Sequence, residues 1–124
     1  MNTFLLLKVK EAILANPEHF DMSLWACGTA ACICGWTAKL AGEYDKLREM
    51  LDSPFDIPEN YPAKLGARLL KIDVEQAEAL FLSGWPVHFL ERYTDAEGDR
   101  VKRAQVVAEA IDDFIAHDGN WHND

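Results

Sequence analysis

The chain has 124 residues, the size of one domain, and a domain of this size buries roughly two-thirds of its unfolded surface without disulfides or metals. Because 49% of the residues are apolar, the formal net charge of −9 does not indicate disorder. The excess of 21 acidic over 12 basic side chains argues against a nucleic-acid groove or an anionic membrane surface, because both need clustered Lys and Arg. Partners are therefore expected to be proteins with basic or neutral surfaces.

The first predicted element is a helix over residues 3–14. Leu6, Val9 and Ile13 recur at the three-and-four spacing of an amphipathic helix, and Asn16-Pro17 ends it. Residues 18–25 have no period and predict a packed loop.

The second predicted helix spans residues 30–41, with Thr29 as its N-cap and Gly42 at its C-terminal cap. Its side chains are unusually small, which favours close contact on more than one face. We therefore expect this helix to be buried centrally, with Cys32 in its first turn and the last helix of the chain packed across it.

A short helix is predicted over 44–51, followed by a connector over 52–62 that holds three of the five prolines and is predicted to be mobile. Two short helices, 63–70 and 73–82, follow as a hairpin. Asp73 and Gln76 have the spacing of a capping box at the start of the second.

Pro86 is predicted at the first position of the next helix, with an apolar side formed by Phe89, Leu90 and Tyr93. The last helix shows the clearest period, and Gly119 is expected to stop it. Its apolar positions are Val101, Ala104, Val107, Ala108, Ile111, Phe114 and Ile115. The carboxylates of Glu109 and Asp113 on this helix are predicted to be solvated charges.

Together these patterns predict an all-α fold, a compact single-domain bundle of about six or seven short helices over residues 1–119, with a tail over 120–124. No strand alternation is present. Trp121 in the tail has no helical pattern and is predicted either to dock back onto the domain or to contribute to an interface.

Residues 67–80 also match the apolar skeleton of a helix-turn-helix. The second helix would present Glu75, Gln76 and Glu78 to DNA, and phosphates would repel this face. We therefore predict a helical hairpin and no direct nucleic-acid binding. The acidic surplus either keeps the protein in solution or imitates nucleic-acid phosphates in a partner's basic groove.

No apolar run approaches the about 20 residues that span a bilayer, and the apolar stretch 4–7 is too short for a signal sequence. The three cysteines are an odd number, so they cannot all pair within the chain. We expect a cytoplasmic protein that does not bind membranes. The sequence predicts no particular oligomeric state.

The most distinctive segment is 27–36, Cys-Gly-Thr-Ala-Ala-Cys-Ile-Cys-Gly-Trp, which holds all three cysteines. With Ala-Arg-Leu-Leu-Lys-Ile at 67–72 and Ile-Asp-Asp-Phe-Ile at 111–115, it resembles a group of small bacterial and bacteriophage proteins of unknown function with a Cys-Gly-Thr-x-x-Cys-x-x-Gly-Trp core. The resemblance covers most of the chain and implies a bacterial or bacteriophage source. Cys34 stands where a small residue such as Ala is expected in the group, so it is the cysteine least expected to be functional.

The candidate site of this segment comprises Cys27, Gly28, Thr29, Cys32 and Trp36. Zinc needs four Cys or His ligands, and the cysteine separations of four residues and of one differ from the common two-residue spacing. No metal or cofactor is therefore predicted, although Cys27 and Cys32 with His19 would be the ligands of a zinc site.

A redox pair is the other reading of the same cysteines. Cys27 and Cys32 lie on either side of the predicted cap, where a helix N-terminus lowers a thiol pKa. Redox enzymes, however, typically use Cys-x-x-Cys beside a βαβ unit.

A catalytic cysteine would need a distant His oriented by Asn or Asp. An all-helical chain of this size lacks the β-sheet layer that usually carries this histidine in cysteine hydrolases. We therefore expect no enzymatic activity and predict a protein-binding module, in the bacteriophage case one that acts on a host protein through an acidic surface. The alternative is a thiol- or zinc-dependent protein centred on Cys27 and Cys32.

Overall fold

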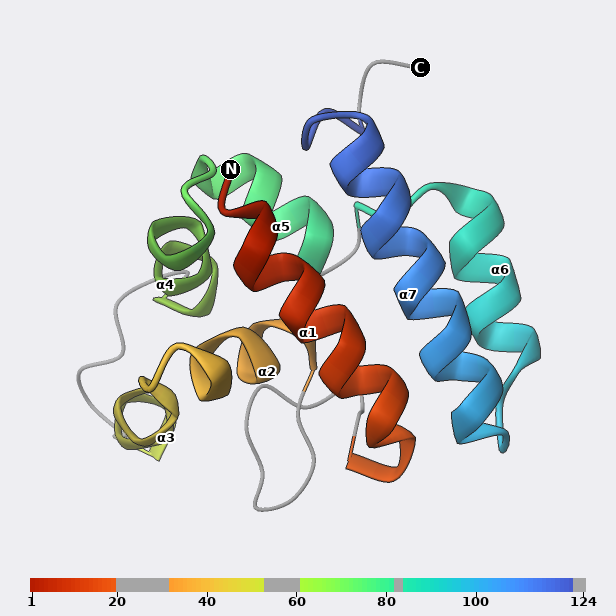
Figure 1. The fold of residues 1–124 in the computed structure, drawn as a ribbon, viewed down its shortest axis with the longest axis horizontal. Helices are drawn as coiled ribbons and strands as arrows, with labels where there is room; N and C mark the ends of the chain where they lie inside the picture. Colours follow the sequence, from red (N-terminus) through yellow and green to blue (C-terminus); the bar gives the residue numbers. More distant parts are fainter. Residues whose placement is uncertain (20–31, 53–60, 82–83, 122–124) are drawn as a thin grey trace.

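The computed structural model describes residues 1–19, 32–52, 61–81 and 84–121, and this part of the chain contains helices and no strand (Figure 1). The α-helices are α1 (Thr3–Ala15), α2 (Ile33–Leu40), α3 (Tyr44–Asp52), α4 (Tyr61–Leu70), α5 (Val74–Phe81), α6 (Val87–Asp95) and α7 (Arg100–Ala116), and a 3₁₀ turn, η1 (Pro17–His19), follows α1. These elements confirm the predicted all-α fold. None of the helices described is both long enough and apolar enough to cross a bilayer.

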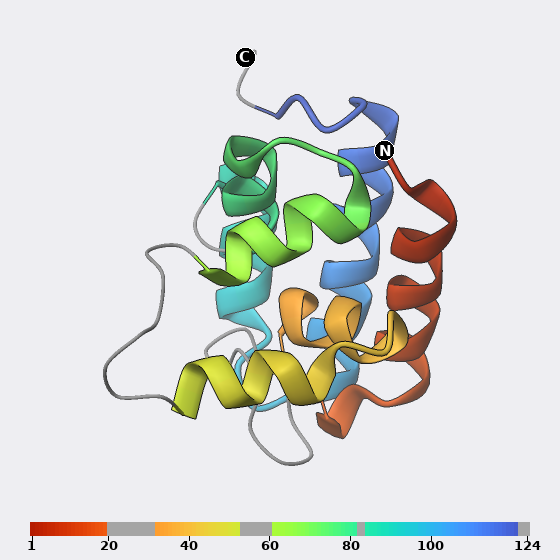
Figure 2. The ribbon, with the colours of Figure 1, turned by 90° about the vertical axis from the view of Figure 1, so that its left-hand side faces the viewer.

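Three helices lie side by side in the order α1, α7 and α6, with α6 at the edge of the molecule (Figure 1). The α4–α5 hairpin packs against α1 and α2, and α3 packs against α2 (Figure 2). The sequence predicts that the last helix packs across α2. This prediction is wrong, because the main contacts of α7 are with α1 and α6. Buried alanines on α7, among them Ala104, Ala108 and Ala110, let these two neighbours approach closely.

Helix α2 lies at the centre of the fold, as its small side chains predict. Every residue from Ile33 to Ala38 is buried, and α2 contacts α1, α3, α4 and α5. Thr37 is the buried polar residue of this helix, and its hydroxyl donates to the carbonyl oxygen of Ile33 at 2.8 Å. The hydroxyl is therefore satisfied inside the core without a partner from another helix.

The two ends of α2 compare differently with the prediction. The helix begins at Ile33 and not at residue 30, because Cys32 has an extended backbone and takes the N-cap position. Thr29, the predicted cap, lies outside the described residues. At the other end Gly42 has a φ of +79°, and the N–H groups of Gly42 and Glu43 donate to Lys39 and Ala38 in a Schellman arrangement.

The α4–α5 hairpin is confirmed, including its turn. Lys71 takes the left-handed conformation at φ 56°, and the Ile72 N–H donates to the Ala67 carbonyl at 3.1 Å. The Gln76 N–H donates to Asp73 Oδ1 at 2.8 Å, and the Asp73 N–H donates to Gln76 Oε1 at 3.1 Å. These reciprocal bonds are the predicted capping box.

Helix α4 begins at Tyr61, two residues before its predicted start. Pro62 sits in its first turn, where a missing N–H costs no hydrogen bond, so the connector predicted over 52–62 is shorter than expected. Within that connector, residues 53–60 lie outside the described part of the chain.

Helices α6 and α7 differ from expectation at single positions. Pro86 is the N-cap of α6 and not its first residue, and Leu90 faces outward with 36% of its surface exposed. Val101, predicted in the apolar stripe, lies in the first turn of α7 and is 56% exposed. Asp118 at φ 54° and Gly119 at φ 80° are both left-handed, and the Gly119 N–H donates to the Phe114 carbonyl at 2.8 Å, so the predicted stop at Gly119 is confirmed.

A close approach between α4 and α5 depends on Gly66. A Cβ added at this glycine would lie 2.0 Å from Cε2 of Phe81, whose ring is buried and cannot move aside freely. We expect Gly66→Ala to lower the free energy of unfolding by about 1–3 kcal/mol, measured by urea denaturation. In a Phe81→Leu background the same change should cost less, and equal costs in both backgrounds would contradict the predicted clash.

Candidate functional site

Part of the predicted cysteine site can be placed in the structure. Cys32 is buried at the N-cap of α2, and Trp36 is buried within this helix. Cys27, Gly28 and Thr29 lie outside the described residues. The expected closeness of Cys27 to Cys32 is therefore a prediction that the structure does not test. Within the described residues, no group of three His, Cys, Asp or Glu side chains is arranged to hold a metal ion.

Cys34 is a buried packing residue. Its side chain is 1% exposed, and its Sγ donates to the carbonyl oxygen of Pro62 at 3.3 Å, which links α2 to the first turn of α4. Burial, with a smaller contribution from Cys32, raises the pKa of the Cys34 thiol well above its ordinary value. A thiol that keeps its proton at neutral pH is a poor nucleophile and metal ligand.

Trp36 joins α2 to the turn after α1. Its indole Nε1 donates to the carbonyl oxygen of His19 at 3.2 Å, and Lys39 Nζ lies 4.8 Å from the centre of its ring. His19 Nδ1 is buried and forms no hydrogen bond in the described structure. The turn that contains His19, a candidate ligand whose position the sequence does not predict, is thus held beside α2.

Trp121 docks onto the body of the molecule, which decides between its two predicted roles. It is 5% exposed, and its ring meets Phe114 edge to face with centroids 5.0 Å apart. Its indole Nε1 donates to Asp113 Oδ2 at 2.7 Å, and Gln76 Nε2 donates to Asn120 Oδ1 at 3.2 Å. These bonds attach the segment after α7 to both α7 and α5.

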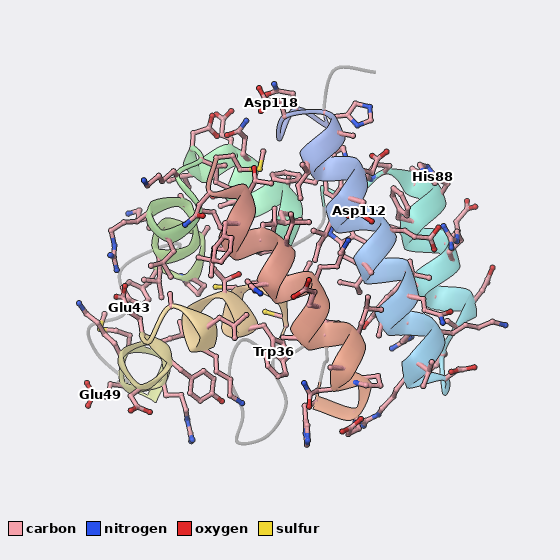
Figure 3. All side chains as sticks on the ribbon, in the orientation of Figure 1. Trp36, Glu43, Glu49, His88, Asp112 and Asp118 are labelled. Carbon is pink, nitrogen blue, oxygen red and sulfur yellow. The ribbon has the colours of Figure 1, made fainter. Side chains whose placement is uncertain are left out.

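The carboxylates of α7 have partners that the sequence does not reveal. Glu109 is exposed as predicted, and its Oε2 lies 2.5 Å from Arg92 on α6. Asp113 is only partly exposed and accepts the indole hydrogen bond, so it is not simply a solvated charge. Asp112, labelled in Figure 3, pairs with Lys10 of α1 at 2.9 Å. The ion pairs of α7 therefore reach both of its neighbouring helices.

Three hollows in the described surface are lined in part by residues of α6 or of the turn before it. One of about 260 Å³ lies between α6 and α7, and one of about 340 Å³ lies beside the start of α6, where His88 and His117 line it. A third, also of about 340 Å³, is lined by Leu90, Glu91, Thr94 and Asp95 on the outer side of α6. The sequence predicts this helix but not the hollows, because they depend on how α6 lies beside α7.

No protein-family model matches the chain, and no curated protein or solved structure is significantly similar to it. The resemblance of residues 27–36 to a bacterial and bacteriophage group therefore stays a prediction. A functional proposal has to be based on the surface and the chemistry of this chain.

The protonated Cys34 thiol makes stability depend on alkaline pH. The folded thiol keeps its proton at a pH where the unfolded thiol ionises, so above about pH 8.5 stability should fall by up to about 1.4 kcal/mol per pH unit. We expect urea denaturation under reducing conditions to show a smaller alkaline loss for Cys34→Ala than for the unmodified chain. Parallel stability curves from pH 7 to pH 10 would show that Cys34 does not contribute.

The bond between Asp113 and Trp121 should be measurable as a coupling energy. Asp113→Ala leaves a buried indole N–H without its acceptor, so we expect a loss of about 1–3 kcal/mol in unfolding free energy. Asp112→Ala, at the next position, removes only an exposed ion pair and should cost less than about 1 kcal/mol. In a Trp121→Phe background the cost of Asp113→Ala should shrink, and an unchanged cost would contradict the assigned bond.

Proposed function

We propose that the protein is a non-enzymatic binding module whose exposed carboxylates bind a protein with a basic or neutral surface. The chemistry of the proposal is electrostatic complementarity, which speeds association and selects partners more than it adds raw affinity. In the bacteriophage setting that the sequence resemblance implies, the partner would be a host protein.

The observation that carries the proposal is an uneven use of charge. Several of the 12 basic side chains are engaged within the fold: Arg68 with Glu43, Arg92 with Glu109, Lys10 with Asp112, Arg103 over the Tyr93 ring and Lys39 over Trp36. The Arg68 hydrogen bond also lowers the pKa of Glu43, so this carboxylate stays ionised. With 21 acidic against 12 basic side chains, the cations are too few to neutralise every carboxylate.

Several exposed carboxylates form no ion pair within the described residues. Asp45 and Glu49 lie on α3, Glu75 on α5, Glu91 and Asp95 on α6, and Glu97 in the turn after α6. Unneutralised charge costs the fold some self-repulsion, and a cationic partner would relieve it. This supports a binding role for the acidic surface over a purely solubilising one.

Affinity capture from a bacterial extract tests the proposal. The tagged chain should retain a small set of proteins with basic surfaces at low salt and release them at about 0.5 M salt, because exposed charge pairs are screened. The comparison bait carries Glu75→Gln, Glu91→Gln, Asp95→Asn and Glu97→Gln, which keep side-chain shape and remove charge. Equal retention by both baits would contradict binding through the acidic surface.

The same experiment separates the alternative function, a thiol- or zinc-dependent protein centred on Cys27 and Cys32. Within the described residues, His19 Nδ1 is buried and has no hydrogen-bond partner, which favours this alternative. A bait with Cys27→Ala and Cys32→Ala should capture the same proteins if the binding proposal holds. Loss of capture, together with an excess of about 65 Da in the native mass of the unmodified chain, would support zinc instead.

A further inference from the structure

Among the helices that the structure describes, α6 packs chiefly against α7. Phe89 is buried against α7, and Tyr93 meets Trp85 edge to face with centroids 5.8 Å apart. The opposite side carries Val87, 68% exposed, and Leu90, 36% exposed. Helix α6 itself lies at the edge of the molecule (Figure 1). Residues 87, 90, 91 and 94 have the i, i+3, i+4, i+7 spacing of one helical stripe, which we call the outer stripe of α6.

The outer stripe can be covered without loss of hydrogen bonds. The Thr94 hydroxyl donates to the Leu90 carbonyl oxygen at 2.9 Å, so this side chain is satisfied within its own helix. Val87 and Leu90 have no polar atoms in their side chains. An apolar group seated over these three positions would therefore leave no side-chain donor or acceptor unpaired.

Charge lies along one side of this stripe. Glu91 belongs to the stripe and Asp95 follows it by one turn, and both line the third hollow together with Leu90 and Thr94. On α6 and α7, Arg92 is paired with Glu109 and Arg103 lies over the Tyr93 ring. Lys102 lines the hollow between the two helices together with Asp95. Glu91 and Asp95 form no ion pair within the described residues, so a ligand with positive charge on this side complements them.

Helix α1 offers a useful contrast, because it also exposes apolar residues. Phe4, Leu7 and Leu14 are exposed, but Lys8 lies 5.5 Å from the Phe4 ring centre and 3.6 Å from Glu11. The charges beside this stripe are thus balanced within α1. The exposed apolar side of α1 has no unmet charge to select a partner.

We propose that the outer stripe of α6 is the docking surface for a basic amphipathic helix of the partner protein. The apolar residues of that helix cover Val87, Leu90 and Thr94, and its Lys or Arg residues lie against Glu91 and Asp95. The inference rests on the proposed binding function and adds to it the surface used and the kind of segment recognised. Helix-on-helix recognition of this kind uses anchors at i, i+3, i+4 and i+7.

A designed peptide is the probe for this surface. It has about 15 residues, or four helical turns, with leucines on one face and lysines along one flank. Its fluorescence anisotropy is followed as the full chain is added at low salt. We expect saturable binding, and no binding by a peptide in which glutamates replace the lysines.

The chain provides closely matched control variants. Leu90→Ser and Val87→Ser should each raise the peptide Kd about tenfold, whereas Leu14→Ser on α1, at a 42% exposed leucine, should change it by less than about twofold. Glu91→Lys should raise Kd about tenfold at low salt, and Glu49→Lys, on α3 at the far side of the molecule from His88 of α6 (Figure 3), by less than about threefold. Circular dichroism establishes that each variant is folded, and Val87→Ser replaces a side chain that the core does not need.

The outcomes separate the docking surface from the binding function. Selective loss on the α6 variants supports the inference. Equal effects of Leu90→Ser and Leu14→Ser, or no binding of the peptide, overturn it. If the bacterial extract still yields charge-dependent partners in that case, the binding function stands and another surface performs it; if it yields none, both proposals fail.

Discussion

The burial of α2 from Ile33 to Ala38 is the constraint on which the other packing arrangements depend. A helix enclosed by α1, α3, α4 and α5 can carry few large or charged side chains between Ile33 and Ala38, because each would need space or a partner. The thiol of Cys34 meets this demand as a small group whose weak hydrogen bond reaches Pro62. The cysteine that the sequence makes conspicuous is thus explained by volume, with no need of reactivity.

Enclosure of α2 also determines which surfaces remain free. The α4–α5 hairpin, α1 and α3 use their apolar sides around α2, while α7 packs on α1 and α6. Among the described helices, α6 is consequently the outermost beside α7, which covers its inner side. An outermost helix with one satisfied face is where an unpartnered apolar stripe can persist at no cost to the core. The position of the proposed docking surface follows from the order in which the helices are layered.

Features set by neighbours in the sequence were predicted well, and features set across the fold were not. The period of Leu6, Val9 and Ile13 and the capping box at Asp73 are local, and the structure confirms them. The approach of Gly66 to Phe81 and the bond from Trp121 to Asp113 join residues whose meeting depends on helix packing. For the same reason no sequence pattern indicates the hollows beside α6. The cysteine motif is a clear sequence pattern, but its described part, residues 32–36, is buried.

Both attached ends of the chain meet the α4–α5 hairpin. The Asn2 N–H donates to the Leu70 carbonyl, Asn2 Nδ2 donates to Leu69, and Gln76 donates to Asn120. Each bond closes a loop of more than forty residues. Closing such a loop lowers the conformational entropy of the chain before the contacts that stabilise the closed form are made. The start of α1 therefore has no place to attach until residue 70 has been synthesised and has folded. During translation this domain would complete its N-terminal helix contacts late, after its middle has formed.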